Sequence, residues 1–580
     1  MNNFKTLSQL ILFQSLKFNN PRALNFKQND SWQSFSNQEF LQKSFYFACA
    51  LKEFGLQKNQ TFANISYQNP IWLIVDFGVI LAGGVSVPMF RDVSIDNLFY
   101  QFQESDIDFV FVDDEEKLLV LQEKNLRKII SYNLKNSGDI SFEEAILLGE
   151  KASQKYDINE FINSVTPNDL VTIIYTSGST GKPKGVELTH NNLVSQIKAT
   201  QLCFPLDKNS DKVLSFLPLA HIFERMVMMF YLTQGVEIYF VDDVKKLGDY
   251  LKETRPTLMT VVPRMLEKVF AKISQGVEDS GFIKKFLAKK SLNRALNKSL
   301  FKHQKPSLID KIFDFLVYKK FRQALGGNMK MIICGGAALS QDLERFYKNI
   351  GINLYCGYGL TETSPVLAVN YKNNYKLGTV GKAFPFVELK IADDKELLAR
   401  GENIMRGYHK QPQKTAESFV DGWFKTGDLA QIDNDGFVKI IGRKKELFKT
   451  ATGKYVSPVP IEQKLLQELG FLIGAIIIAE GRKFVSALLF PDFEVLKKFK
   501  MKLNFNGDNI SFLQSDILQK FVEKAVDKLN SSLNHSEQIR KFAIITQEIS
   551  IENSEITPSM KLKRGFLEEK YKKIIDDFYL

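Results

Sequence analysis

The chain has 580 residues, of which 44% are hydrophobic and 25% are charged, with a formal net charge of +11. This length exceeds the size at which one hydrophobic core keeps growing, and the ordinary composition excludes a fibrous or disordered protein. Its four cysteines lie far apart without a C-x-x-C pair, which excludes a disulfide framework or a zinc site and indicates a reducing compartment.

The N-terminal stretch MNNFKTLSQLILFQS has a broken apolar run of roughly six residues, shorter than the core of a signal peptide. No stretch approaches the roughly 20 consecutive apolar residues of a membrane span. We therefore expect a cytoplasmic protein.

Short apolar runs rich in β-branched residues alternate with helical stretches, a pattern typical of an α/β fold. The predicted buried strands lie at residues 170–175, 212–217, 236–241, 257–262, 329–334 and 352–356. Their spacing leaves room for crossover helices and so predicts mainly parallel sheets. Because ligands bind at the carboxyl ends of strands in such sheets, we expect the loops that follow these strands to converge.

The stretch IIYTSGSTGKPKG, residues 173–185, has the small residues of a phosphate-binding loop, which let backbone N–H groups and hydroxyls surround an anion. It is not a Walker loop, because Lys182 is followed by Pro183 where that motif requires a serine or threonine to hold magnesium. A flexible surface turn is the alternative. The predicted phosphate-binding residues are Thr176, Ser177, Gly178, Ser179, Thr180, Gly181, Lys182 and Lys184.

Residues 281–325 are strongly basic, with twelve lysines and arginines against two aspartates. Within them, the predicted helix 308–325 has one apolar face, formed by Ile309, Ile312, Phe313, Leu316 and Val317. Such a helix could lie on an anionic membrane surface, where each basic residue contributes about 1 kcal/mol. The alternative is a core-packed helix with a solvated basic face. No nucleic-acid partner is expected, because no recognition module accompanies the charge.

Two further strings follow predicted strands. In CGGAALS, residues 334–340, glycines permit close approach of a ligand ring. In GYGLTETS, residues 357–364, an aromatic face suits a base, and threonine and glutamate oxygens suit magnesium. Glu362 alone could instead cap the next helix. The predicted binding residues here are Gly335, Gly336, Ala337, Gly357, Tyr358, Gly359, Thr361 and Glu362.

After about residue 376 the runs become shorter and are split by Gly, Asp and Asn, which predicts β-hairpins up to a boundary near Arg443. Within GWFKTGDL, Asp428 could accept hydrogen bonds from both hydroxyls of a ribose, although Gly-Asp is also a common β-turn. Arg443 could supply a second sugar or phosphate contact. Residues 446–580 are long enough for a small α+β domain.

In order and in most letters, these strings resemble the signature of the adenylate-forming superfamily, which includes acyl-CoA synthetases, luciferases and the adenylation domains of peptide synthetases. The resemblance extends from NPRALNFKQNDSWQSFS at residue 20 to KLKR at residue 561. FLPLAHIFERMV at residues 216–227, the stretch at residues 421–458 and the basic insert are similar to the long-chain fatty acyl-CoA synthetase branch.

The resemblance implies a large N-terminal adenylate-forming domain, residues 1–442, built of parallel sheets with helices plus a small β subdomain. The basic helical insert, residues 281–325, belongs to it. A small, mobile α+β C-terminal domain, residues 443–580, follows. Lys445 falls at the hinge position about which that domain rotates between two poses.

The family reaction has two steps. A fatty carboxylate attacks the α-phosphate of ATP to give acyl-AMP and pyrophosphate, and the thiol of CoA then displaces AMP. Because the carboxylate and the phosphate are both anionic, Mg2+ and a lysine must supply positive charge between them. The resemblance therefore implies a fatty acid, ATP and CoA as substrates and Mg2+ as cofactor.

The resemblance also assigns roles to residues. Thr176 and Glu362 match the magnesium ligands, and the loop from Thr176 to Lys184 matches the pyrophosphate cradle. Tyr358 and the string Gly335 to Ala337 match the adenine contacts, while Asp428 and Arg443 match the ribose contacts.

Three residues are predicted to be catalytic: Glu362, His221 and Lys561. Lys561 matches the lysine that bridges the carboxylate and the α-phosphate. His221 matches a position beside the acyl pocket, with a packed, hydrogen-bonded side chain as the alternative. Met560 stands where much of the superfamily has glycine, which leaves Lys563 as a rival to Lys561, and Gly442 replaces the common aspartate before the hinge arginine.

The preferred interpretation of the sequence is a fatty acid:CoA ligase that contacts the inner face of the cell membrane peripherally. Two alternatives stay open. The same acyl-AMP could pass to an acyl carrier protein instead of CoA, or the protein could be a membrane lipid carrier without catalysis.

Overall fold

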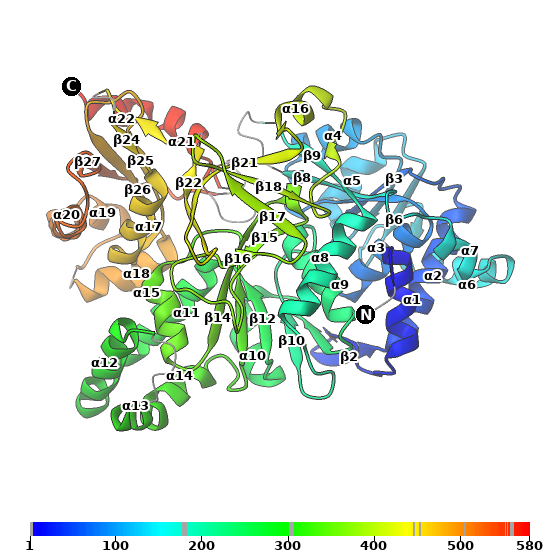
Figure 1. Ribbon diagram of the computed structural model, residues 1–580, viewed down its shortest axis with the longest axis horizontal. Coiled ribbons are helices and arrows are strands. Elements are labelled where there is room, and N and C mark those ends of the chain that lie inside the picture. The colour runs from blue at the N-terminus through cyan, green and yellow to red at the C-terminus, as the bar shows by residue number, and fades with distance from the viewer. Residues whose placement is uncertain are drawn as a thin grey trace. The chain divides into compact units, whose positions relative to one another are not determined.

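The computed structural model (Figure 1) describes residues 4–176, 182–300, 307–444, 447–451, 454–503, 505–550, 553, 555–556 and 562–580. The chain is divided into two compact units. The larger comprises Met1–Lys390, Leu398–Thr426 and Ile432–Lys439, and the smaller comprises Ile391–Leu397, Gly427–Gln431 and Ile440–Leu580. Mixed helices and sheets, with parallel strands at the centre of the large sheets, confirm the predicted α/β class.

One sheet of the larger unit has, among the described residues, the strand order β16-β15-β14-β13-β12-β10-β11-β1-β2. Its strands are β1 (Leu24–Gln28), β2 (Ser31–Phe35), β10 (Lys212–Ser215), β11 (Glu237–Phe240), β12 (Leu258–Val261), β13 (Met331–Cys334), β14 (Asn353–Gly359), β15 (Val366–Val369) and β16 (Lys382–Ala383). Parallel pairing joins the six central strands, which in spatial order are β14, β13, β12, β10, β11 and β1. The pairs that involve β2, β15 and β16 are antiparallel.

A second sheet of this unit has the order β19-β9-β8-β4-β3-β5-β6-β7. Its strands are β3 (Thr61–Ile65), β4 (Val85–Pro88), β5 (Phe109–Val112), β6 (Lys128–Ser131), β7 (Ile140–Ser141), β8 (Leu170–Thr176), β9 (Lys184–Thr189) and β19 (Gly407–Tyr408). All six strands predicted from sequence are confirmed, as β8 and β10 to β14. Their short, continuous apolar runs fit strands that are covered on both faces.

Helices surround these sheets. They are α1 (Leu7–Lys17), α2 (Asn37–Glu53), α3 (Pro70–Leu81), α4 (Ile95–Glu104), α5 (Glu115–Gln122), α6 (Phe142–Ala152), α7 (Ile158–Asn163), α8 (His190–Cys203), α9 (Ile222–Leu232), α10 (Leu247–Thr254), α15 (Gln341–Asn349) and α16 (Pro412–Glu417). Local sequence sets several starts: Ser36 and Glu39 form a capping box before α2, and Asn69 followed by Pro70 begins α3.

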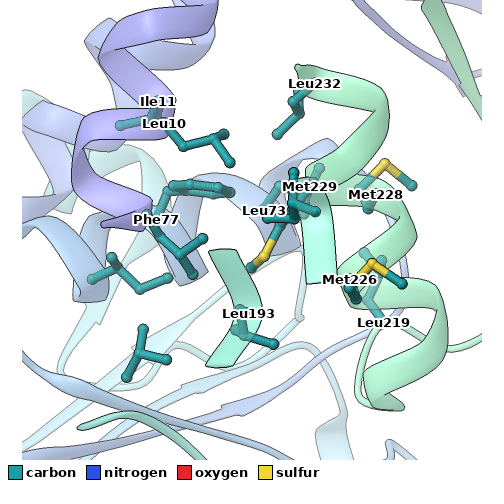
Figure 2. Close-up of a cluster of buried hydrophobic side chains, with 14 of the residues drawn as sticks. Leu10, Ile11, Leu73, Phe77, Leu193, Leu219, Met226, Met228, Met229 and Leu232 are labelled. Carbon is teal, nitrogen blue, oxygen red and sulfur yellow. The ribbon is translucent and has the colours of Figure 1, made fainter. Parts of the chain in front are cut away.

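The main hydrophobic core of the larger unit joins four helices that are distant in sequence. Figure 2 shows Leu10 and Ile11 of α1 and Leu73 and Phe77 of α3 facing Leu193 of α8 and the methionine-rich helix α9. These side chains are almost completely buried. Burying one such side chain contributes about 1.5–3 kcal/mol, so this cluster holds the helices firmly together.

The basic insert is helical. It contains α12 (Phe282–Asn297), α13 (Leu308–Phe313), the π-helical segment η3 (Asp314–Tyr318) and α14 (Lys319–Gln323), and it follows α11 (Pro263–Glu278). In Figure 1, α12, α13 and α14 are green and lie together. The Tyr318 hydroxyl donates to the Ser291 carbonyl at 2.9 Å, which ties η3 to α12.

The helical prediction for residues 308–325 is confirmed, and the apolar side chains divide between buried and exposed positions. Phe313 and Val317 are buried, whereas Ile309, Ile312 and Leu316 are 43 to 52% exposed. The buried side is completed by Tyr318 and Phe321.

A third sheet has the order β17-β18-β21-β20, with β22 paired to β21. Its strands are β17 (Val387–Ile391), β18 (Glu396–Gly401), β20 (Phe419–Val420), β21 (Trp423–Ile432) and β22 (Val438–Arg443). These strands confirm the hairpins predicted after about residue 376.

The smaller unit has its own core on a sheet of order β25-β26-β27, with β25 (Leu472–Ile478), β26 (Val485–Pro491) and β27 (Ile539–Ile544). Two short strands, β23 (Phe448–Lys449) and β24 (Tyr455–Val456), form a separate hairpin. The helices are α17 (Pro458–Glu468), α18 (Phe493–Lys502), α19 (Asn509–Leu513), α20 (Asp516–Asn530), α21 (Arg564–Lys570) and α22 (Lys572–Asp577). This is the small α+β unit predicted for the C-terminal region.

Candidate active site

Two adjacent parallel strands of the larger unit bring two predicted loops together. Cys334 at the end of β13 lies in register with Cys356 of β14, so the loop that begins at Gly335 starts beside Gly357, where β14 continues to Gly359. Gly336 has a φ of +81°, a conformation that favours glycine. A Cβ at Gly359 would lie 1.8 Å from the Pro365 carbonyl oxygen, so the backbone there admits no side chain.

Glu362 follows directly, in the short 3₁₀ helix η4 (Thr361–Thr363). Its Oε1 accepts a hydrogen bond of 2.9 Å from the Tyr408 hydroxyl, and its carbonyl oxygen accepts one of 2.8 Å from the Met405 N–H. The carboxylate is therefore oriented by a second segment of chain. The alternative role of Glu362 as a helix cap does not match these contacts, because its carboxylate accepts from the Tyr408 side chain.

The two sides of the predicted phosphate loop are held in one hairpin. Thr176 at the end of β8 pairs with Lys184 at the start of β9, while Ser177 to Gly181 lie outside the described residues. The Lys184 ammonium lies 4.9 Å from the centre of the Tyr408 ring, and that of Lys182 lies 5.4 Å from the Tyr100 ring. Lys184 and Glu362 thus meet at Tyr408.

His221 stands at the start of α9, as its N-cap residue. Its Nδ1 accepts a hydrogen bond of 3.2 Å from the Phe223 N–H, which assigns the ring proton to Nε2 when the imidazole is neutral. A Cβ at Gly335 would lie 3.2 Å from the Phe223 ring. The beginning of α9 therefore lies against the loop predicted to hold adenine.

Arg225 in α9 forms a fully buried ion pair with Asp76 of α3. Its Nη2 and Nε donate to the two carboxylate oxygens at 2.7 and 2.9 Å, and its Nη1 donates to the Thr172 hydroxyl of β8 at 2.7 Å. Ser86 of β4 donates a further hydrogen bond of 2.6 Å to Asp76. Such complete pairing is what a buried charge requires.

Glu224, the preceding residue, points to the other sheet. Its two oxygens accept hydrogen bonds of 2.6 Å from Ser215 of β10 and 2.5 Å from Thr260 of β12. Burial raises the pKa of Glu224 to about 7, although both hydrogen bonds oppose that change. Consecutive residues of α9 are therefore bonded to two different sheets.

The predicted ribose-binding residues lie in the smaller unit and contact each other. Arg443 Nε lies 2.9 Å from Asp428 Oδ1, and the Asp428 side chain is only 5% exposed. Lys445 and Lys561 lie outside the described residues. The backbone N–H of the rival Lys563 donates to the Glu555 carbonyl at 2.9 Å, and a Cβ at Gly442 would lie 2.7 Å from the Ser457 hydroxyl.

In the described part of the larger unit, Tyr408 connects Lys184 with Glu362, and the Gly335 loop lies beside Gly357 of β14 and the start of α9. Sequence reasoning missed Tyr408, Glu224 and Arg225. A usable signal existed for the last two, because a Glu-Arg pair inside the apolar run AHIFERMVMMFYL indicates charges buried with partners. Tyr408 had no such signal.

The donors at the candidate site fit magnesium. The Thr176 hydroxyl and the Glu362 carboxylate supply oxygen atoms, and Mg2+ in proteins is bound by one or two such ligands together with substrate phosphates. The loop residues and Lys184 suit the phosphates themselves.

Comparison with protein families gives two matches that together cover most of the chain. A family described as AMP-binding enzyme matches residues 14–409, and one described as AMP-binding enzyme C-terminal domain matches residues 446–580.

Curated proteins similar to the chain include long-chain-fatty-acid–CoA ligases. FadD15 of Mycobacterium bovis is 34% identical over 545 residues, which cover 92% of this chain and 90% of that protein. ACSBG1 of Homo sapiens, also a long-chain-fatty-acid–CoA ligase by name, is 30% identical over 607 residues, which cover 97% of this chain and 84% of that protein.

Solved structures share the fold. The adenylation domain of a carboxylate reductase from Mycobacterium chelonae has a TM-score of 0.75 at 19% identity, covering 99% of this chain and 91% of that one. ATP-bound MatB from Rhodopseudomonas palustris has a TM-score of 0.70 at 21% identity, covering 98% and 99%.

Proposed function

Because the chain belongs to the AMP-binding enzyme family, and within it to the long-chain-fatty-acid–CoA ligases, we propose that it activates a long-chain fatty acid with ATP and transfers the acyl group to CoA. In the first step a carboxylate oxygen bonds to the α-phosphorus and the bond to the pyrophosphate oxygen breaks, giving acyl-AMP and pyrophosphate. In the second, the CoA sulfur bonds to the acyl carbon, AMP leaves and the thiol proton is released.

The observation that carries the proposal is the register of β13 and β14. The carboxyl end of β13 opens into the Gly335 loop beside Gly357 of β14, which ends at Gly359 shortly before Glu362, and the Gly335 loop lies against the start of α9. A nucleotide at the carboxyl ends of parallel strands is the expected arrangement for such a sheet. Gly335 to Ala337 and Tyr358 would contact adenine there.

The remaining roles follow from the chemistry of the groups. Lys184 and the residues from Thr176 to Lys182 bind the β- and γ-phosphates, and Thr176 and Glu362 hold Mg2+. When bound, Mg2+ neutralises phosphate charge and so lowers the repulsion against the fatty carboxylate. Lys561 places a positive charge between carboxylate and α-phosphate.

Asp428 and Arg443 bind the ribose in this proposal. An ionised carboxylate accepts from two hydroxyls at once, and the Arg443 guanidinium, 2.9 Å away, keeps it oriented. His221 lies beside the acyl pocket in this proposal.

A direct assay tests the function. Purified protein with ATP, Mg2+ and a panel of fatty acids should exchange labelled pyrophosphate into ATP, and added CoA should give acyl-CoA identified by mass. Holo acyl carrier protein in place of CoA tests the alternative acceptor in the same assay. Glu362→Gln should lower the exchange rate at least tenfold, because it removes a charged metal ligand. Absence of exchange with every fatty acid would contradict the proposal.

We also propose that residues 443–580 form the mobile C-terminal domain, with the hinge at Lys445. The match of the C-terminal family from residue 446 and the smaller unit's continuous stretch from Ile440 support this boundary. Proline fixes φ and restricts the residue before it. Lys445→Pro should therefore slow thioester formation more than pyrophosphate exchange, whereas equal slowing of both would speak against a hinge.

No helix in the described part of the chain is long and apolar enough to cross a membrane. We propose instead that the basic insert rests on an anionic membrane surface. Phe282, Ile283 and Phe286 of α12 are exposed, as is Phe315 of η3. Basic residues that surround exposed aromatic side chains suit the boundary between lipid headgroups and acyl chains.

The lysines of α12 differ in their contacts within the fold. Lys285 and Lys289 lie 2.9 and 2.8 Å from Glu278, and together they lower the pKa of that carboxyl to about 2. Lys284 and Lys290 are exposed on the same helix.

Flotation with anionic and with neutral vesicles tests the membrane proposal. Lys284→Gln with Lys290→Gln should lower binding to anionic vesicles about tenfold or more, since each lysine contributes about 1 kcal/mol near such a surface. Lys520→Gln with Lys524→Gln, exposed residues of α20, changes net charge equally and serves as the control. An equal loss in both variants would show that the insert is not the contact.

A further inference from the structure

Tyr408 contacts two side chains that belong to different motifs. Its hydroxyl donates a hydrogen bond of 2.9 Å to Glu362 Oε1, and its ring lies under the Lys184 ammonium at 4.9 Å. Glu362 comes from η4 after β14, and Lys184 comes from β9 of the other sheet. One aromatic side chain thus joins the glutamate and the lysine.

The backbone around Tyr408 is held at both ends. Gly407 and Tyr408 form β19, which pairs with β9 opposite Glu187 and Val186. The Tyr408 N–H donates to the Thr415 hydroxyl at 2.9 Å, and a Cβ at Gly407 would lie 2.8 Å from Thr415. Tyr408 therefore starts from a fixed position.

Neighbouring backbone hydrogen bonds reach the same two motifs. The His409 N–H donates to the Gly185 carbonyl at 2.7 Å, next to Lys184 in sequence. The Met405 N–H donates to the Glu362 carbonyl at 2.8 Å. The segment from Met405 to His409 thus spans the distance between η4 and β9 with main-chain as well as side-chain contacts.

We propose that Tyr408 is a positioning residue of the adenylate-forming site, which sets the separation between the Glu362 carboxylate and the Lys184 ammonium before MgATP binds. The inference rests on the proposed function, in which these two groups act on the metal and on the phosphates. Tyr408 touches neither the metal nor the nucleotide in this role.

The chemistry of tyrosine suits each contact. A hydroxyl that donates to Oε1 fixes the carboxylate plane and leaves Oε2 as the oxygen for a metal, as outer hydrogen-bond partners of metal ligands do. The ring face attracts the ammonium without cancelling its charge, whereas a carboxylate partner would neutralise it.

Two substitutions separate the two contacts. Tyr408→Phe keeps the ring under Lys184 and removes the hydrogen bond to Glu362. Tyr408→Leu removes both. The matched control is Tyr156→Phe, because Tyr156 also donates to a glutamate, Glu53 Oε1 at 3.0 Å, but lies in a different, exposed part of the larger unit.

The measurement is calorimetric titration of the full-length variants with ATP, once with excess Mg2+ and once with EDTA. Tyr408→Phe should weaken binding with Mg2+ about tenfold and change metal-free binding little, because the metal ligand alone loses its partner. Tyr408→Leu should weaken binding in both conditions. Tyr156→Phe should match the wild type.

The outcomes distinguish the inference from a purely structural role. Lower thermal stability with an unchanged Mg2+ dependence in Tyr408→Phe would overturn it, as would an equal loss with and without Mg2+. If the wild type bound MgATP but exchanged no pyrophosphate with any fatty acid, the proposed function would fail. The comparison of Tyr408→Phe with the wild type would still decide the role of Tyr408 in MgATP binding.

Discussion

Helix α9 and the basic insert are both helical segments that combine apolar with charged residues, yet those residues lie in opposite environments. All eleven residues of α9 except Phe223 are buried, and its two charged side chains have partners inside the protein. The insert exposes Phe282, Ile283 and Phe315 and carries most of its lysines at the surface. Composition alone does not separate these two cases.

The difference shows that the placement of charge, rather than its amount, indicates what a helix does. A charged group inside a core must be fully paired, so Glu224 and Arg225 indicate that polar partners are packed around α9. Exposed aromatic side chains among lysines need no such partner within the fold, and they are candidates for a contact with a membrane surface.

The largest expected effect tests the buried charge of α9. Arg225→Met removes one partner of the Asp76 ion pair and leaves an uncompensated carboxylate, so it should destabilise the protein by about 3–5 kcal/mol. Urea unfolding measures the change. Adding Asp76→Leu should restore part of the loss, because no buried charge then remains. A single variant as stable as the wild type would refute the assigned importance of the pair.

A matched pair of substitutions tests the two sides of the insert. Phe313 at the end of α13 is 8% exposed, and Phe315, two residues later in η3, is 74% exposed. Phe313→Ala should cost about 3 kcal/mol, near the lower end for a buried phenylalanine, while Phe315→Ala should stay within about 0.5 kcal/mol. Thermal unfolding of both variants measures the difference. Equal losses of stability would show that the two sides of the insert do not differ in burial.

The titration of Glu224 gives the next largest effect. The folded state keeps the proton up to a pKa of about 7, whereas the unfolded chain releases it near 4.5. Wild-type stability therefore falls as pH rises between these values, by about 3 kcal/mol, since one pKa unit corresponds to about 1.4 kcal/mol.

Glu224→Gln removes this titration and keeps groups that hydrogen-bond with Ser215 and Thr260. Relative to the wild type, its stability should rise between about pH 5 and pH 8. Denaturant unfolding at both values measures the difference. A constant difference across that range would mean that Glu224 does not titrate there in the folded protein.

The smallest effect on stability is expected for the exposed end of α12. Replacing Phe282, Ile283 and Phe286 together by serine should change the free energy of unfolding by about 0.5 kcal/mol or less, because these side chains are exposed. The same variant should bind anionic vesicles less tightly than the wild type. Unchanged vesicle binding would limit the contact to electrostatics.

Much of the fold could be predicted because its strands are short, continuous apolar runs that end in glycine-rich loops. The strands β8 and β10 to β14, the hairpins after about residue 376 and the α+β unit are confirmed, and so is membership of the predicted superfamily. Each of these features is either local in sequence or matches most residues of a known motif.

The missed features depend on contacts between distant residues. Tyr408 and Glu362 are 46 residues apart, and no periodicity relates them. Helical periodicity also did not show which apolar side chains of residues 308–325 are buried and which are exposed, nor that the helix contains the π-helical segment η3. The roles assigned to Lys561, Lys445 and the residues from Ser177 to Gly181 stay predictions, since these residues lie outside the described part of the chain.

The adjacent pair Glu224 and Arg225 has a consequence for how the larger unit melts. Neighbouring side chains on a helix point about 100° apart, so a single turn of α9 is fastened to the β10 and β12 side and to the β8 side at once. Separating either sheet from α9 exposes a buried ionisable group to solvent or leaves it unpaired. The two sheets should therefore lose their structure in one cooperative transition, without a stable intermediate in which only one of them remains folded.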